Sequence, residues 1–141
     1  MRIRIADQND APSVAHLLGQ LGYETAVDAA RRRIEALVRS EDRALYLAEV
    51  GGSLVGLIEV AVMQAIEHDP RAEIRALVVD ESHRGQGLGA GLVEAAETWA
   101  RDRGVGIIRV RSNIKRERTR LFYEKNGYRA TKTSLVFDKE L

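Results

Sequence analysis

The feature that most constrains the fold is a glycine-rich segment between an apolar strand pattern and a helical pattern. Residues 73–79 end in the apolar run Leu77-Val78-Val79, which is typical of a buried strand. The glycine-rich segment follows and reads Arg84-Gly85-Gln86-Gly87-Leu88-Gly89-Ala90. Residues 87–103 then have apolar or small side chains at helical spacing, and residues 107–111 return to a strand pattern. This order predicts a parallel crossover, and ligands tend to bind where such a strand ends and its helix begins.

The remaining chain predicts a mixed sheet with helices around it. We expect strands over residues 2–5, 44–50 and 54–62, with Gly51-Gly52 as a hairpin turn between the last two. One or two further strands are expected over residues 128–138. Helices are expected over residues 12–21, 27–38 and 118–125 besides the helix after the glycine segment. The predicted fold is α/β, with a mixed, mostly antiparallel sheet of six or seven strands and about four helices in a single domain, residues 1–141.

Two local patterns add detail to this prediction. Thr25 followed by Asp28 resembles a capping box at the start of the second helix. The sequence Glu67-His68-Asp69-Pro70 predicts a polar loop before the strand that leads to the glycine segment.

Composition excludes several classes of function. The 141 residues include 45% hydrophobic and 30% charged side chains, so a packed core is expected, and the net charge of +1 does not favour nucleic-acid binding. The chain has no cysteine, so disulfides, thiolate zinc sites and a cysteine nucleophile are excluded. No His-Glu-x-x-His motif occurs among the three histidines, so we expect no metal site. No apolar run is long enough to span a membrane, and we expect a cytoplasmic protein with no membrane partner.

The glycine-rich segment places open backbone amides at a helix N-terminus, which favours binding of a phosphate or pyrophosphate. The spacing Gly85-x-Gly87-x-x-Ala90 formally fits a dinucleotide fingerprint, but five residues, 80–84, separate it from the strand. The next strand leads into Ser112-Asn113 rather than an acidic residue, and no triphosphate-binding Gly-x-x-x-x-Gly-Lys-Ser/Thr loop occurs. Both nucleotide alternatives are therefore excluded.

Three segments in this order and spacing resemble the GNAT superfamily of acetyl-CoA-dependent N-acetyltransferases. They are Leu77-Val78-Val79-Asp80, Arg84-Gly85-Gln86-Gly87-Leu88-Gly89 and Leu121-Phe122-Tyr123-Glu124-Lys125-Asn126-Gly127-Tyr128. The resemblance implies that acetyl-CoA is the co-substrate and that the GNAT-like fold covers the whole chain. It also implies that the backbone of residues 84–90 binds the coenzyme pyrophosphate. Leu77, Val78 and Val79 would pair with the pantetheine arm as an added strand.

The resemblance further implies that Tyr123 is the general acid that protonates the departing thiolate. A tyrosine with a pKa near 10 is protonated at pH 7, as this role requires. Asn113 stands where many relatives have an asparagine that contacts the coenzyme after the fifth strand. Arg116 stands where another asparagine is common in relatives.

The general base is less clearly indicated. Arg75 and Ala76 stand where relatives often carry a carboxylate on the strand, so that role does not transfer. Glu73 is the first choice, and the alternatives are Glu59, Glu67 and His68.

We therefore expect direct transfer of the acetyl group from acetyl-CoA to a primary amine of a small molecule, with a homodimer as a possible assembly. The alternatives are a peptide or protein N-acetyltransferase and a non-catalytic acyl-CoA binding module. Residues 112–116 and 136–141 are also similar to a subgroup containing aminoalkylphosphonate N-acetyltransferases. In that subgroup's pattern, Arg75, Arg116 and Arg118 would meet an anionic substrate group.

Overall fold

The computed structural model describes all residues, 1–141, which divide into two compact units over residues 1–110 and 111–141. Each unit is described by itself. The first contains the sheet and three of the α-helices, and the second contains α4 (Glu117–Lys125).

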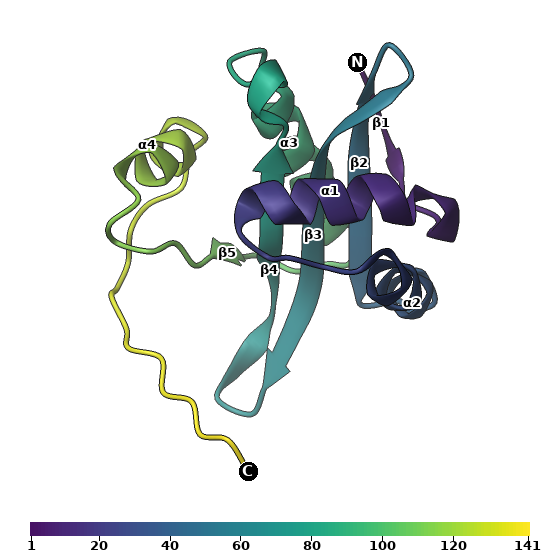
Figure 1. Cartoon of the computed structure of the whole chain (residues 1–141). Coiled ribbons are helices and arrows are strands. Elements are labelled where there is room, and N and C mark those ends of the chain that lie inside the picture. Colours follow the sequence, from purple (N-terminus) through teal and green to yellow (C-terminus); the bar gives the residue numbers. More distant parts are fainter. The chain divides into compact units, whose positions relative to one another are not determined.

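One five-stranded sheet organises residues 1–110 (Figure 1). Its strands lie side by side in chain order and are β1 (Arg2–Ile5), β2 (Arg43–Val50), β3 (Ser53–Ala65), β4 (His68–Val79) and β5 (Ile108–Val110). The first four pair antiparallel, whereas β4 and β5 pair parallel because the helix α3 (Leu88–Asp102) connects them. The predicted mixed, mostly antiparallel α/β sheet is confirmed, but the predicted six or seven strands are corrected to five.

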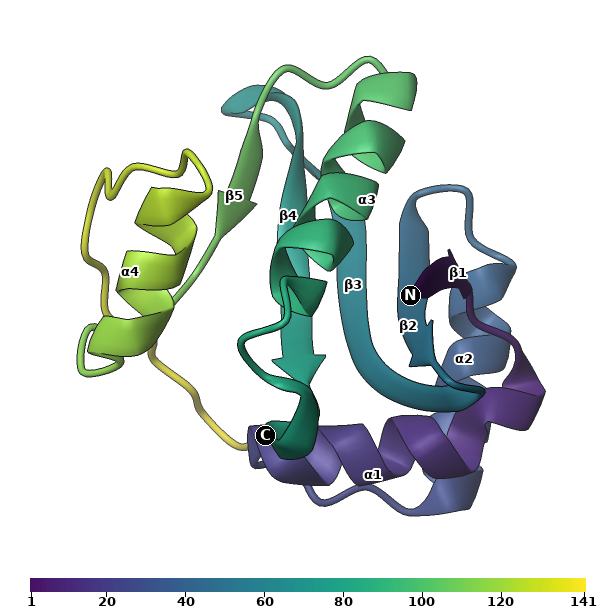
Figure 2. The same ribbon diagram turned by 90° about the horizontal axis from the view of Figure 1, so that it is seen from above.

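Helices cover both faces of the sheet. Figures 1 and 2 show α1 (Ala11–Leu21) and α2 (Val27–Val38) on one face and α3 on the other. The core between α1, α2 and the sheet includes Val14, Leu17, Ile34, Leu45, Leu47, Leu57 and Val78. On the opposite face, α3 buries Leu88, Leu92, Val93, Ala96 and Trp99. None of the helices is long and apolar enough to cross a membrane.

Glycines end or connect several elements where the sequence predicts it. Gly51 and Gly52 turn the β2–β3 hairpin with φ values of 58° and 80°, and Gly22 ends α1 with φ 103°. These left-handed conformations are accessible to glycine at little cost. The predicted capping box is wrong, because Ala26 is the N-cap of α2 and the Thr25 hydroxyl donates instead to the Tyr23 carbonyl at 3.0 Å.

Two further expectations need correction. The predicted polar loop over residues 67–70 is mostly strand, because the β3–β4 hairpin continues to the pair Ala65 and His68. The predicted strands over residues 128–138 are absent, and this segment has no regular secondary structure. A strand needs a neighbouring edge to satisfy its backbone groups, and no ladder of the sheet includes this segment.

Two short 3-10 helices, η1 (Gln8–Asp10) and η2 (Glu81–His83), complete the structure. Arg4 of β1 fastens η1 to the sheet. Its Nη1 and Nη2 atoms donate to Asp10 at 2.9 and 2.8 Å, and its Nε donates to Glu49 of β2 at 2.7 Å. The hydrogen bonds from Arg4 hold the pKa of the buried Asp10 carboxyl below its usual value.

We expect Arg4→Met to lower the free energy of unfolding by about 3 kcal/mol at pH 7, because it leaves the Asp10 carboxylate buried without its cation. The lowered pKa means that Asp10 stabilises the wild type above pH ~4 and loses this effect as the pH falls. Urea unfolding at pH 7 and pH 3 should therefore show a smaller difference between the two proteins at pH 3. The double variant Arg4→Met/Asp10→Asn should recover part of the loss, and equal midpoints at pH 7 would contradict the assignment.

Candidate functional site

The β4 strand has an open edge over its last residues. The β4–β5 ladder ends at the pair Ile74 and Val110, whereas β4 continues to Val79 and stays paired with β3 up to Gly56. The two parallel strands therefore part after Ile74. The sheet offers backbone groups on one edge of β4 that β5 does not use.

The backbone direction shows which groups face this open edge. The Asp80 amide donates to the Val55 carbonyl at 2.7 Å, so it points toward β3. Since successive residues of a strand alternate between its two edges, the backbone groups of Leu77 and Val79 point away from β3. The Val79 carbonyl accepts a hydrogen bond from Arg84 Nε at 3.2 Å, as this direction requires. Among the three residues predicted to pair with the pantetheine arm, Val78 differs from the other two. Its backbone groups point toward β3, and its side chain is buried in the core.

The glycine turn follows directly and begins α3. Gly85 and Gly87 have φ values of 81° and 79°, and Gly87 is the N-cap with no side chain to cap the helix. The Gly91 amide donates to the Gly87 carbonyl at 3.1 Å, which begins the helical pattern. The amides of residues 88–90 therefore have no acceptor within the helix, and this arrangement suits an anion.

Asp80 holds the chain between β4 and the glycine turn. Its carboxylate accepts hydrogen bonds from the Ser82 amide and hydroxyl and from Gln20 Nε2 at 2.7 Å, and lies 3.1 Å from His83 Nδ1. The interactions with Ser82, Gln20 and His83 hold the pKa of Asp80 well below its usual range. Gln20 Oε1 also accepts from the Glu81 amide at 3.0 Å, so α1 is tied to the turn.

The contribution of Gln20 was missed in the sequence analysis. Gln20 is 60 residues from Asp80 along the chain, and no local pattern predicts their contact. Only the spacing of Asp80 and Ser82, typical of a side chain that caps its own turn, gave a signal for this network.

A β-bulge at Arg75 brings two carboxylates onto one face of the sheet. Val60 pairs with Ile74 and Glu59 pairs with Ala76, so Arg75 is the extra residue. Because Glu73 pairs with Ala61, both Glu73 and Glu59 lie on the face that α1 and α2 cover.

The predicted base, Glu73, is buried with 3% of its surface exposed. Arg75 Nη1 donates to Glu73 Oε1 at 2.9 Å, and Arg109 of β5 lies beside Glu73 in the ladder. The other candidates for the general base have different surroundings. Glu59 is 3.5 Å from Arg43 Nη2, and Glu67 and His68 are at the far end of the β3–β4 hairpin.

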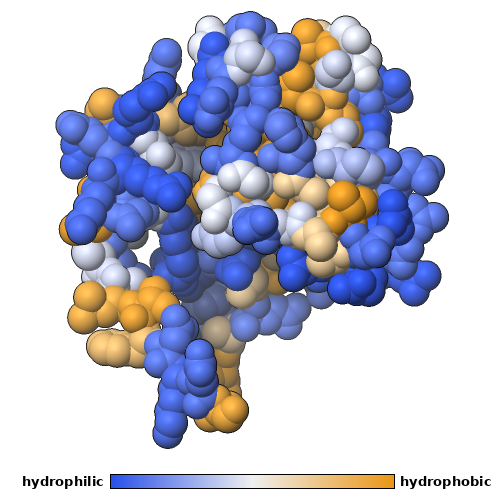
Figure 3. Space-filling model, viewed as in Figure 1, coloured by the Kyte–Doolittle hydropathy of each residue, from blue (hydrophilic) through white to orange (hydrophobic).

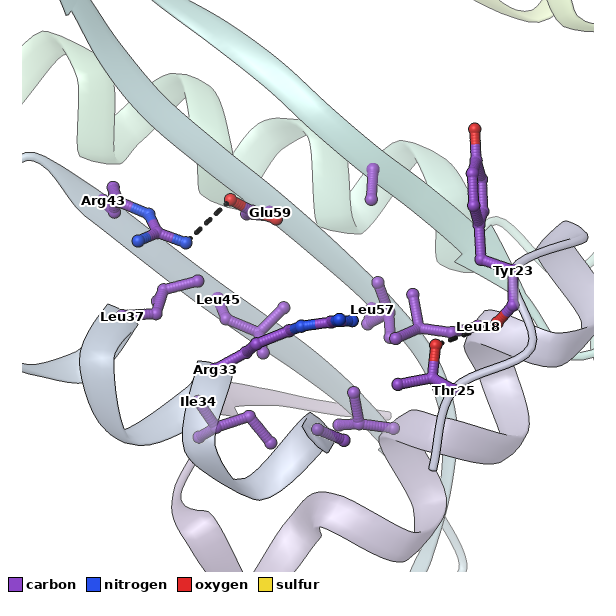
Figure 4. Close-up of a pocket in the computed structure, with 13 residues that line it drawn as sticks. Leu18, Tyr23, Thr25, Arg33, Ile34, Leu37, Arg43, Leu45, Leu57 and Glu59 are labelled. Carbon is purple, nitrogen blue, oxygen red and sulfur yellow. Dashed lines mark hydrogen bonds and ion pairs between the residues drawn. The ribbon is translucent and has the colours of Figure 1, made fainter. Parts of the chain in front are cut away.

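A cavity of about 250 Å³ lies between α1, α2 and the sheet (Figure 4). Its wall is largely apolar, and its polar side chains are Tyr23, Thr25, Arg33, Arg43 and Glu59. Ala76 of β4 is also part of the wall, so the cavity reaches the strand that has the open edge.

Tyr123 and Asn113 belong to the second unit, residues 111–141. Tyr123 of α4 is 8% exposed and meets Phe122 and Tyr128 edge-on, with ring centroids 5.1 and 5.4 Å apart. Its burial raises the pKa of the Tyr123 hydroxyl to about 12. Asn113 Oδ1 accepts from the Lys115 amide at 2.9 Å. Of the predicted site, β4, the glycine turn and Glu73 therefore lie in residues 1–110. Tyr123 and Asn113 lie in residues 111–141.

Comparison with known proteins identifies one family. Residues 11–128 match the acetyltransferase (GNAT) family. The chain is 32% identical to aminoalkylphosphonate N-acetyltransferase from Salmonella typhimurium over 90% of this chain and 84% of that protein. It is 29% identical to glucosamine 6-phosphate N-acetyltransferase from Trypanosoma brucei brucei over 98% and 95% of the two chains.

The fold is also that of a solved acetyltransferase. The aminoglycoside N-acetyltransferase AAC(6')-Iy in complex with CoA superposes with a TM-score of 0.85 over 99% of this chain and all of the other, at 16% identity. The open edge of β4, the glycine turn and the family match lead to one conclusion. The chain belongs to the GNAT family of acetyltransferases, with acetyl-CoA as its acetyl donor.

Proposed function

We propose that this protein transfers the acetyl group of acetyl-CoA directly to a primary amine of a small molecule. The observation that carries the proposal is the open edge of β4, which leads straight into the uncapped N-terminus of α3. An extended arm with amide groups can pair with such an edge, and a pyrophosphate can accept hydrogen bonds from the helix amides. Coenzyme A has both parts in this order.

The coenzyme would contact mostly backbone. In this proposal Leu77 and Val79 pair with the pantetheine amides while Val78 supports the strand from the core. Arg84 would leave the Val79 carbonyl and pair with the pyrophosphate. The phosphates would lie on the backbone of residues 85–90, including Gln86 and Gly89. Asn113 would be a further contact of the coenzyme.

A neutral amine is needed for the attack on the thioester. An amine with a pKa near 10 is about 0.1% neutral at pH 7, so removing its proton costs roughly 4 kcal/mol. We propose Glu73 as the base that accepts this proton through water. This buried carboxyl accepts a hydrogen bond from Arg75 Nη1 at 2.9 Å, which holds one of its oxygens in place.

The amine nitrogen then attacks the thioester carbonyl carbon, the C–N bond forms and the C–S bond breaks. The sulfur leaves as a thiolate and takes the hydroxyl proton of Tyr123. With a pKa of about 12, Tyr123 is protonated throughout the neutral range. Desolvation also raises the pKa of a thiol in the same environment, which keeps the proton transfer within reach of the tyrosine.

The cavity supports a small acceptor rather than a peptide. Its volume of about 250 Å³ is slightly below the range of pockets that hold drug-sized ligands, and helices cover it on one side. Two relatives also act on small amines, as their names state. The predicted homodimer is a further part of this proposal, to be measured by light scattering.

Gly87→Ala should weaken coenzyme A binding about tenfold, because a side chain at φ 79° strains the turn by ~1–2 kcal/mol. Gly104→Ala is the matched control, since Gly104 has φ 75° at the opposite end of α3. Titration calorimetry should show normal binding for the control and weaker binding for Gly87→Ala. Equal losses in both variants would remove the turn from the binding site.

Tyr123→Phe should lower kcat at least 100-fold and leave coenzyme affinity nearly unchanged, because it removes only the proton donor. Thiol release from acetyl-CoA with a panel of amines measures both activity and acceptor class. If the wild type binds acetyl-CoA but releases no thiol with any amine, a non-catalytic binding module is the better description. Unchanged turnover in the variant would exclude Tyr123 as the acid.

Glu73→Gln should lower kcat/KM about 100-fold and remove the acidic limb of its pH profile, because the variant cannot accept a proton. Glu59→Gln is the comparison, since this carboxylate lies on the same face of the sheet. If the acidic limb disappears in Glu59→Gln and persists in Glu73→Gln, then Glu59 is the base.

A further inference from the structure

The two guanidinium groups of the cavity wall differ in their partners. Arg43 of β2 lies 3.5 Å from Glu59, and this ion pair crosses from β2 to β3 on the cavity floor. Arg33 of α2 has no hydrogen bond and no ion pair in the structure. Figure 4 shows its side chain stretched across the cavity toward Leu57, away from both members of the Arg43–Glu59 pair.

The position of Arg33 contrasts with that of its neighbours on α2. Arg31 pairs with Asp28 one turn earlier at 3.0 Å. Arg32 and Arg33 are both exposed, but only Arg33 is part of the cavity wall. Hydrophilic residues dominate the face that carries α1 and α2, so solvent is close by (Figure 3). Arg33 is also exposed, but its side chain lies across the apolar wall of the cavity, where its guanidinium can pair with a bound anion.

Further cationic groups lie on the same sheet face beyond the cavity. Arg71 and Arg109 flank Glu73, and neither forms an ion pair in the structure. Arg71 Nε and Arg109 Nη1 are buried without a hydrogen-bond partner. These charges add to the positive potential around the cavity and attract anionic acceptors toward it.

We propose that the acceptor amine carries a phosphoryl group, either a phosphate monoester or a phosphonate, and that Arg33 binds it. This inference rests on the proposed acetyl transfer to a small amine. A phosphoryl group has about −1.5 to −2 charges at pH 7 and three acceptor oxygens, which suit the donor fork of a guanidinium. The amine end of the same molecule would point to Ala76, where the cavity meets β4.

Binding at two points would orient the acceptor. The phosphoryl group at Arg33 and the amine near β4 fix both ends of a short molecule within one cavity. A neutral amine of the same length lacks the first contact and should bind more weakly without any change in the chemical step.

The test compares matched amines with the wild type and with charge variants of α2. The phosphorylated acceptors are 2-aminoethylphosphonate and O-phosphoethanolamine, and the neutral ones are propylamine and ethanolamine. We expect kcat/KM of the wild type to be at least tenfold higher for the phosphorylated amines. Arg33→Gln should remove most of this preference through KM, Arg33→Lys should restore part of it, and the neutral amines should react as before.

Arg32→Gln is the matched control, because Arg32 is adjacent on α2 and exposed like Arg33 but lies outside the cavity wall. No preference in the wild type, or equal losses in Arg32→Gln and Arg33→Gln, would overturn the proposal. Calorimetry with 2-aminoethylphosphonate and coenzyme A gives a readout that needs no turnover. Binding that depends on Arg33 in a protein that acetylates no amine would support the anion site and refute the acetyl transfer, whereas acetylation of neutral amines alone would do the reverse.

Discussion

The separation of β4 from β5 after one short ladder is the constraint on which the site depends. Parallel strands normally continue side by side and satisfy each other's backbone groups. Here the ladder covers residues 72–74 of β4, and the strand continues beyond it to Val79. The backbone groups that β5 does not use lie next to the glycine turn. An extended donor molecule with a charged end therefore matches both the strand edge and the turn.

This arrangement separates the work of backbone and side chains along the same strand. Val78 belongs to the core that α1 and α2 form, while Leu77 and Val79 turn their backbone groups outward. In the proposed binding mode, the coenzyme is recognised without demanding particular side chains at these positions. A chain with no cysteine can catalyse acyl transfer in this way, because the coenzyme supplies the activated acyl group and the protein supplies position and a few proton carriers.

Local patterns predicted the elements that depend on local physics. The Gly51–Gly52 hairpin, the start of α3 at Gly87 and the end of α1 at Gly22 follow from backbone conformations that glycine accepts. The bulge at Arg75 could not be predicted, because it depends on the register between β3 and β4. The same holds for the contact of Gln20 with Asp80 and for the cavity, which need distant segments to be packed together. The strands expected over residues 128–138 failed because apolar alternation alone does not provide a neighbouring edge.

In the proposed function, the electrostatics of the α1–α2 face separate acceptor recognition from acetyl transfer. Arg43 and Arg75 each have a carboxylate partner, Glu59 and Glu73, which offsets the cost of holding charge near the core. Arg33 is exposed and has no such partner, so its charge is available to an anion bound in the cavity. Because α2 lies apart from β4 along the sheet, a substitution on this helix can change which acceptor is bound while the coenzyme site stays intact. Acceptors as different as an amino sugar phosphate and an aminoalkylphosphonate can then be served by one fold, since both have an amine at one end and a phosphoryl group at the other.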